Sequence, residues 1–422
     1  MPLVHKQIIA VTSLLATASL LLSTAQAQES SVAATERRSD EVAAFLNSTY
    51  FKRIRPVSTT VTPSGQTIDW VDPVDLDPKY WTRKPPSEAT DPNGNYDEQN
   101  MGEPVPMETE VDPSLRGPEG TVPVYRPNFS YFVDGRSDKE SLQEFIASIP
   151  TPQPEGQDRL YGLRRHAVTN IGTQAWLNIW NFGQVPSDGM SLSQLSLHCG
   201  SGNSIETIEL GFQKLPSLYG DSNIHIFSYF TTGGYGNQAD YVRGYNQTVA
   251  GFVPYTGASF GPGATIPTPH SVVGGTQRER RLRVVRDGDA YWLQDWTGPS
   301  SFTWLGYYPI GSGEGEIPFN LIDDEACNVS WYGEVFDPTP TSWTSANMGS
   351  GEFAAEGQGN AAYVRGIIVE RSSGNIWFST AATTGGASDN NCYTVSAVSS
   401  GGSGWERSFF YGGPGGDATG CN

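Results

Sequence analysis

Positive charge is scarce in this sequence. Its 422 residues include 26 Lys and Arg against 45 Asp and Glu, so the formal net charge is -19 at pH 7. Binding to nucleic acid needs clustered Lys and Arg that neutralise phosphates, and we therefore expect no nucleic-acid partner. An acidic chain suits an enzyme that works in acid, where carboxylates protonate and self-repulsion falls, but the same charge would also keep an exported protein in solution.

Long apolar runs are missing beyond the N-terminus. No segment after residue 27 approaches the ~20 apolar residues of a spanning helix, so no membrane partner is expected. The N-terminus has Lys6, an apolar stretch from Ile8 to Leu22 and small residues at positions 25–27, a pattern typical of a signal peptide. Residues 1–27 are therefore predicted to be a signal peptide, and the mature protein to be secreted, or periplasmic in a Gram-negative host.

Signatures of cofactor chemistry are also absent. The four cysteines form no CxxC pair and the histidines have no metal-ligand spacing, so neither a metal nor another cofactor is expected. Cysteines that follow a signal peptide favour disulfides instead.

The chain divides at a proline cluster, residues 150–154. Residues 28–150 are rich in Pro, Asp, Glu and Arg and predict a small mixed α/β segment that is partly coil. Helices are expected over residues 36–46 and 137–147, and a strand over residues 68–74.

Residues 151–422 have a different character, with short apolar or alternating runs separated by Gly, Ser, Asn and Asp. This pattern predicts an all-β domain, an antiparallel β-sandwich. Expected strands include residues 166–171, 174–180, 192–199, 204–213, 223–231, 329–336 and 361–370.

Two of these strands each carry one glutamate away from their apolar face. Because side chains alternate along a strand, Glu209 shares a face with Gln213, and Glu334 shares a face with Tyr332. Gln213 and Tyr332 are candidates to orient a water or bind a substrate carbonyl, or they are plain polar lining of a groove.

Two carboxyl groups that meet in a groove cannot both ionise easily, so one stays protonated and one charged. Such a pair can perform acid-catalysed hydrolysis, in which the carboxylate takes a proton from water and the acid donates one. Three alternatives remain open: Glu209 and Glu334 are ordinary strand glutamates, they serve an acid glycosidase, or the sandwich binds carbohydrate or cell wall without catalysis.

Several stretches, in order, resemble the catalytic domain of the neprosin family. They are QAWLNIWN at 174–181, TIELGFQ at 207–213, LYGD at 218–221, WYGEV at 331–335, MGSGEF at 348–353 and YGGPG at 411–415. Upstream, residues 45–52, 64–71 and 117–123 resemble the activation segment that precedes such enzymes.

This resemblance implies a glutamic endopeptidase with its Glu pair in a β-sandwich, at Glu209 and Glu334. It implies cleavage after proline, and therefore a proline-containing protein or peptide as substrate. It also implies that residues 28–150 are a prosegment and an intramolecular inhibitor, that residues 151–422 are the catalytic domain, and that a disulfide joins Cys392 and Cys421.

Two further expectations concern cross-linking and maturation. Cys199 and Cys327 lie shortly upstream of Glu209 and Glu334, so a bridge between them would hold the acid-bearing strands together; buried free thiols are the alternative. A protease that cuts after proline would find a substrate in its own residues 150–154, and Arg164-Arg165 is a rival site for an external enzyme.

Overall fold

The computed structural model describes residues 31–87, 102–152, 159–235, 242–298, 301–338, 345–379, 382–401, 405, 407–417 and 420–421. The predicted signal peptide and the end of the proline cluster, residues 153–154, lie outside these residues. Within them, no helix combines the length and apolar character that crossing a membrane requires.

Two large sheets make up the main body. The first has the order β10-β9-β8-β7-β16-β5-β19, with β12 paired to β9. Its strands are β5 (Arg159–Asn170), β7 (Met190–Cys199), β8 (Glu206–Lys214), β9 (Ile224–Thr231), β10 (Arg243–Tyr245), β12 (Thr265–Ile266), β16 (Ala326–Phe336) and β19 (Thr383–Thr384). Every pairing in this sheet is antiparallel.

The second sheet has the order β11-β15-β14-β13-β6-β17-β21-β20, with β18 on β17. Its strands are β6 (Gly172–Asn178), β11 (Val253–Pro254), β13 (Arg278–Asp287), β14 (Ala290–Gly298), β15 (Ser301–Pro309), β17 (Ala362–Glu370), β18 (Ile376–Trp377), β20 (Thr394–Val395) and β21 (Phe409–Gly412). A separate hairpin follows, β22 (Gly416–Asp417) with β23 (Gly420–Cys421).

A single large apolar core lies between the two sheets. The predicted apolar faces of the acid-bearing strands are in it: Ile208, Leu210 and Phe212 from β8, and Val329, Trp331 and Val335 from β16. Burying each such side chain contributes about 1.5 to 3 kcal/mol, which fixes which face of each strand the glutamates must take. The all-β sandwich expected from the sequence is confirmed.

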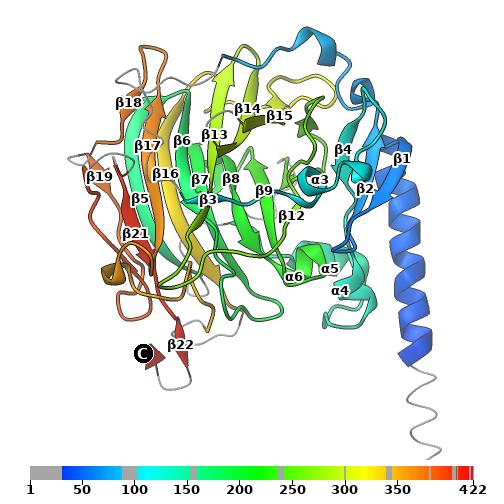
Figure 1. The fold of residues 1–422 in the computed structure, drawn as a ribbon. Helices are drawn as coiled ribbons and strands as arrows, with labels where there is room; N and C mark the ends of the chain where they lie inside the picture. Colours follow the sequence, from blue (N-terminus) through cyan, green and yellow to red (C-terminus); the bar gives the residue numbers. More distant parts are fainter. Residues whose placement is uncertain are drawn as a thin grey trace, which may run out of the picture.

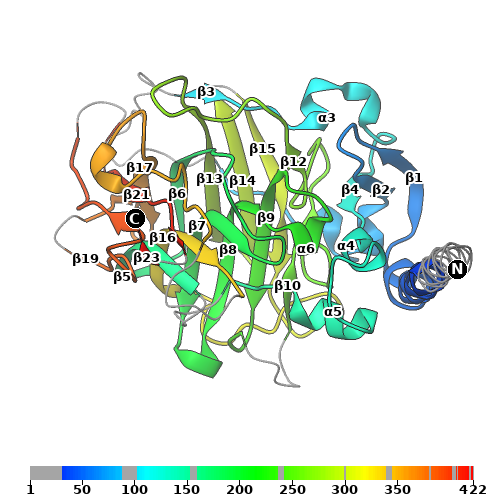
Figure 2. The same ribbon diagram turned by 90° about the horizontal axis from the view of Figure 1, so that it is seen from below.

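The N-terminal part is a small mixed unit at one end of the sandwich (Figures 1 and 2). Residues 31–45 form a helix, followed by η1 (Leu46–Tyr50) and α2 (Phe51–Arg53). The other elements are the three-stranded sheet of β1 (Pro56–Val61), β2 (Thr67–Val71) and β4 (Val122–Tyr125), then α3 (Glu108–Val111), α4 (Ser130–Val133) and α5 (Leu142–Ser148). One strand of this part, β3 (Glu103–Pro104), pairs in parallel with β13 of the main body.

Several element boundaries differ from the sequence predictions. The strand expected over residues 166–171 is β5, which already begins at Arg159. The helix expected from residue 137 begins at Leu142, because Ser141 and Glu144 form a reciprocal capping box. The strand expected to reach residue 74 ends at Val71, because the side chain of Asp72 caps the 3-10 helix η2 (Pro73–Asp75).

Candidate active site

Glu209 and Glu334 are fully buried on the same face of the first sheet. Strand β7 lies between their strands, and its Ser196 pairs with Glu209 while its Leu192 pairs with Glu334. The glutamates are thus two strands apart and offset by four residues. Strand spacings of about 4.8 Å and a rise of about 3.3 Å per residue place their Cα atoms about 16 Å apart.

Glu209 is surrounded by neutral donors. Its Oε1 accepts hydrogen bonds from the hydroxyls of Thr207 and Tyr235, each at 2.9 Å. Its Oε2 accepts from Gln194 Nε2 at 2.6 Å and from the Tyr332 hydroxyl at 3.3 Å. Burial raises the pKa of Glu209 above its usual value, and these hydrogen bonds offset that rise only in part.

Glu334 has a cation as its partner. The Arg159 guanidinium, on the neighbouring strand β5, donates from Nη1 to Glu334 Oε1 at 2.9 Å. Both side chains are buried, and the guanidinium also lies 4.5 Å from the centre of the Phe336 ring. Burial is the largest single influence and lowers the pKa of Arg159, but Glu334 together with the nearby Tyr161 and Tyr245 outweighs it, and the pKa is raised.

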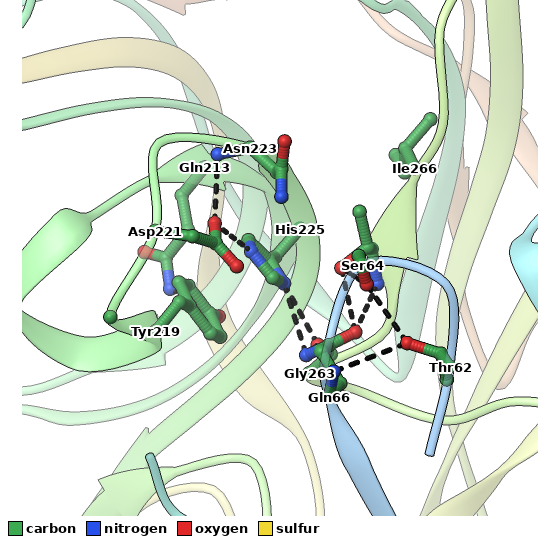
Figure 3. Close-up of polar contacts among 12 residues, drawn as sticks. Thr62, Ser64, Gln66, Gln213, Tyr219, Asp221, Asn223, His225, Gly263 and Ile266 are labelled. Carbon is green, nitrogen blue, oxygen red and sulfur yellow. Dashed lines mark hydrogen bonds and ion pairs between the residues drawn. The ribbon is translucent and has the colours of Figure 1, made fainter. Parts of the chain in front are cut away.

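Of the two other predicted site residues, the structure brings one to the acids. Tyr332 precedes Glu334 by two residues on the same face, and its hydroxyl contacts Glu209, so it lies between the two carboxyls. Gln213 is on the same face but donates to the hydroxyl of Tyr219 at 2.7 Å, beside His225 (Figure 3). The substrate-binding role of each stays a prediction.

A polar groove of about 530 Å³ adjoins Glu209 on this face. Its lining includes Ser196, Thr207, Tyr235, Ser330 and Tyr332. Because hydroxyl groups line it, the groove offers hydrogen-bonding partners to an extended chain.

At the opposite end of the same face lie Ile149 and Pro150, from the end of the N-terminal part. Ile149 packs against an aromatic cluster that includes Tyr229 and Tyr245. The Tyr245 hydroxyl donates to the carbonyl oxygen of Pro150 at 3.0 Å. Pairing across β8, β9 and β10 places Glu209, Tyr229 and Tyr245 in one row, so this junction lies over the row that contains Glu209.

The N-terminal sheet also contacts this part of the molecule. In the turn between β1 and β2, Gln66 donates to the carbonyl oxygen of Gly263 at 2.7 Å and accepts from the amide of Thr265 at 2.9 Å (Figure 3). Its Nε2 also lies 3.4 Å from Nδ1 of His225, whose Nε2 is 3.0 Å from Asp221. His225 pairs with Gln213 across β8 and β9, so the turn is held close to the row that contains Glu334.

Sequence reasoning missed four of the contacts to the acids. One is Thr207, which lies two residues from Glu209 on the same strand face and could have been found. Gln194 could have been found, because it lies on the polar face of an alternating strand beside β8. Tyr235, in the loop after β9, and Arg159, at the first position of β5, had no signal, since only the pairing of strands distant in sequence brings them to the glutamates.

The disulfide expectations have different outcomes. Cys199 and Cys327 are bonded, with Cα atoms 5.0 Å apart, and tie the end of β7 to β16. Their prediction is confirmed, and the alternative of free thiols is wrong. Cys392 is disulfide-bonded, but the side chain of its predicted partner, Cys421, lies outside the described residues.

Comparison with known proteins identifies the family. The family model described as Neprosin matches residues 187–414, more than half of the chain. Solved structures with similarity include Scytalido-glutamic peptidase with a peptide-based transition state analog, at 10% identity over 60% of this chain and 97% of that one, with a TM-score of 0.34. Another is SCP-B of the Eqolisin family of peptidases with the tripeptide Ala-Ile-His, at 9% identity over 60% and 98%, with a TM-score of 0.32. The chain belongs to the neprosin family, and this membership supports a peptidase of the glutamic type.

Proposed function

We propose that this chain is the secreted zymogen of an acid-active glutamic endopeptidase that cleaves after proline, with Glu209 and Glu334 as its catalytic pair. One observation carries the proposal. In a chain of the neprosin family, glutamates from two separate strands are buried on one face of a sheet, beside a polar groove.

The two carboxyl groups suit general acid–base hydrolysis of a peptide bond. One accepts a proton from water while the water oxygen bonds to the peptide carbonyl carbon, and the other donates its proton to the carbonyl oxygen. The tetrahedral intermediate then collapses: the C–N bond breaks, the nitrogen leaves with the proton that the first carboxyl took from water, and the second carboxyl regains its proton from a hydroxyl of the intermediate. Tyr332 lines the groove and its hydroxyl donates to Glu209, so it lies where it can contact the substrate carbonyl.

The surroundings of the junction support a preference for proline. Pro150 and Pro152 are buried in this segment. Next to it lies an apolar cavity of about 390 Å³ between the prosegment and the sandwich, and the walls that would stay after release of the prosegment include Leu218, Tyr229 and Tyr245. A compact aromatic pocket of this kind would receive a pyrrolidine ring.

The same segment supports inhibition by the prosegment, residues 28–150. It covers one end of the face that carries the acids, and the hydrogen bond from Tyr245 to Pro150 holds it there. Cleavage within residues 150–154 would release this cover. The rival site, Arg164-Arg165, lies inside β5, whose backbone pairs with β16 and β19, so an external protease would first have to pull the strand out of the sheet.

The test is an assay of the acid-treated full-length protein at pH 3 to 7, with a quenched fluorescent peptide that contains proline and with a panel of polysaccharides. Glu209→Gln and Glu334→Gln are compared with the wild type. We expect peptide cleavage that each substitution abolishes, and N-terminal sequencing should place the new terminus within or just after residues 150–154.

Release of sugars without peptide cleavage would contradict the proposal and indicate a glycosidase. Retention on insoluble polysaccharide without turnover would indicate a binding module. Maturation of Glu334→Gln at the wild-type rate, without added protease, would contradict self-processing.

A further inference from the structure

The two glutamates have electrostatically different partners, and this difference can assign their roles. Glu334 contacts the Arg159 guanidinium at 2.9 Å, whereas the contacts of Glu209 come from one amide and three hydroxyls. A cation beside a carboxyl favours its charged form far more than neutral donors do.

We infer that Arg159 is a positioning residue that keeps Glu334 as the carboxylate, which makes Glu334 the base and Glu209 the acid of the reaction. This inference rests on the proposed function and deepens it. Arg159 does not touch the reacting atoms; it acts through Glu334.

Three tyrosines among the described residues also interact with Glu334 and do not compete with this effect. They are Tyr161 on β5, Tyr332 on β16 and Tyr245 on β10, whose hydroxyls have pKa values raised far above the acidic range, chiefly by burial. The β7 residue opposite Glu334 is Leu192. Among the described residues that face Glu334, Arg159 is the cation.

Two further cations lie on this face and act elsewhere. Arg165 donates from Nε to Ser330 Oγ at 3.3 Å, six residues along β5 from Arg159. Arg243 donates to the carbonyl oxygen of Tyr235, on the Glu209 side of the site. The ion pair of 2.9 Å between Arg159 and Glu334 is therefore the contact from which we derive the charge difference between the two acids.

The surroundings of Glu209 suit a carboxyl group that carries a proton. Oε1 of the Gln194 amide is buried and has no hydrogen-bond partner among the described residues, while its Nε2 lies 2.6 Å from Glu209. The O and N of a side-chain amide are assigned from their hydrogen-bond partners. With the Gln194 amide rotated by 180°, Oε1 would face Glu209 and accept a hydrogen bond from a protonated carboxyl. The acid can therefore hold its proton without displacing a neighbour.

The position of Arg159 also constrains maturation. A cut within residues 150–154 leaves Arg159 on the catalytic chain, next to the new N-terminus. A cut at Arg164-Arg165 would remove Arg159 and with it the partner of Glu334. An enzyme matured at the second site should therefore behave like a variant that lacks this arginine.

The experiment measures kcat against pH for the activated enzyme, with Arg159→Gln, Arg159→Lys and the matched control Arg165→Gln, which removes a cation from the same strand and face. Without the cation, Glu334 protonates at higher pH, so the acidic limb of the Arg159→Gln profile should move up by roughly 1 to 3 pH units. The alkaline limb, which reports loss of the Glu209 proton, should stay in place. Arg159→Lys should keep the acidic limb near that of the wild type, because the contact uses a single guanidinium nitrogen, and Arg165→Gln should keep it as well.

Folding is monitored by thermal melting, and variants that fail to self-process are activated with a trace of wild-type enzyme. If Arg159→Gln does not fold, Arg159→Ala is assayed with guanidinium chloride against sodium chloride at equal ionic strength, and guanidinium should return the acidic limb toward the wild-type position. An unmoved acidic limb in a folded variant, or a shift of the alkaline limb instead, overturns the inference. Activity that survives both Glu→Gln substitutions is a different result, because it overturns the proposed function itself.

Discussion

The hydroxyl of Tyr245 donates a hydrogen bond of 3.0 Å to the carbonyl oxygen of Pro150. This bond joins the last strand in the row that contains Glu209 to the segment at the boundary between the N-terminal part and the sandwich. It is buried, so breaking it leaves a polar group without a partner or requires water to enter. The junction is therefore held over the proposed catalytic face by a specific contact as well as by apolar packing.

Tyr245→Phe should speed maturation. Loss of a buried hydrogen bond of about 1 kcal/mol corresponds to a change of about fivefold in the population of the released junction. The half-time of conversion after a shift to acidic pH, followed on gels, should shorten several-fold. Tyr308→Phe is the matched control, because it removes a buried hydroxyl that bonds Ser228 in the core, and equal acceleration by both variants would contradict the prediction.

Glu209→Gln and Glu334→Gln should have opposite effects on stability. The raised pKa of Glu209 means that its contribution to stability is fully present below the unfolded pKa and is lost as pH rises through the folded pKa. The neutral amide of Glu209→Gln avoids this loss. The melting temperature of the variant minus that of the wild type should therefore increase as the pH rises from about 4 to neutral.

Glu334→Gln instead leaves the buried Arg159 without its carboxylate. Removing one partner of a buried ion pair costs about 3 to 5 kcal/mol, so this variant should melt well below wild type at neutral pH. If the melting temperatures of Glu209→Gln and Glu334→Gln changed with pH in the same way, the two carboxyl groups would have similar surroundings. That result would contradict the contacts described above.

Gly211→Ala should disturb the acid site without touching a carboxyl. A Cβ at this position would lie 2.2 Å from the carbonyl oxygen of Ser193 and 2.6 Å from Cβ of Gln194, which bonds Glu209. Overpacking of this kind costs about 1 to 3 kcal/mol, and we expect kcat to fall at least tenfold because Gln194 and Glu209 must shift. Gly386→Ala, where the added Cβ meets nothing within 4 Å, should change the free energy of unfolding by less than about 0.5 kcal/mol.

The Cys199–Cys327 bridge should be a large contributor to stability. It closes a loop with a sequence separation of 128, for which the chain-entropy model gives about 4 to 5 kcal/mol. Denaturant unfolding of Cys199→Ser/Cys327→Ser should show a loss approaching this value, with a larger m-value if the unfolded chain expands. A loss under about 1 kcal/mol would contradict a structural role for the bridge.

The alternation of apolar and polar residues along single segments predicted much of the fold. The alternation in residues 205–213 and 330–336 was enough to place Ile208 and Val335 in the core and Glu209 and Glu334 on the other face, because strand geometry leaves only two faces and burial chooses between them. The all-β sandwich and the bridge between Cys199 and Cys327 followed from similarly local features. The ends of helices were harder to predict. Several residues before Ser141 could also start α5, but the capping box at Ser141 sets its first residue.

By itself, the amino-acid sequence determined the sheet-forming segments, their buried faces and the two glutamates that those faces exclude from the core. Tertiary structure alone decided which strands became neighbours, and therefore that Arg159 pairs with Glu334, that Tyr235 and Gln194 surround Glu209, and that Pro150 lies against Tyr245. The physical reason is that alternation acts within one strand, whereas register between strands depends on how the whole core packs.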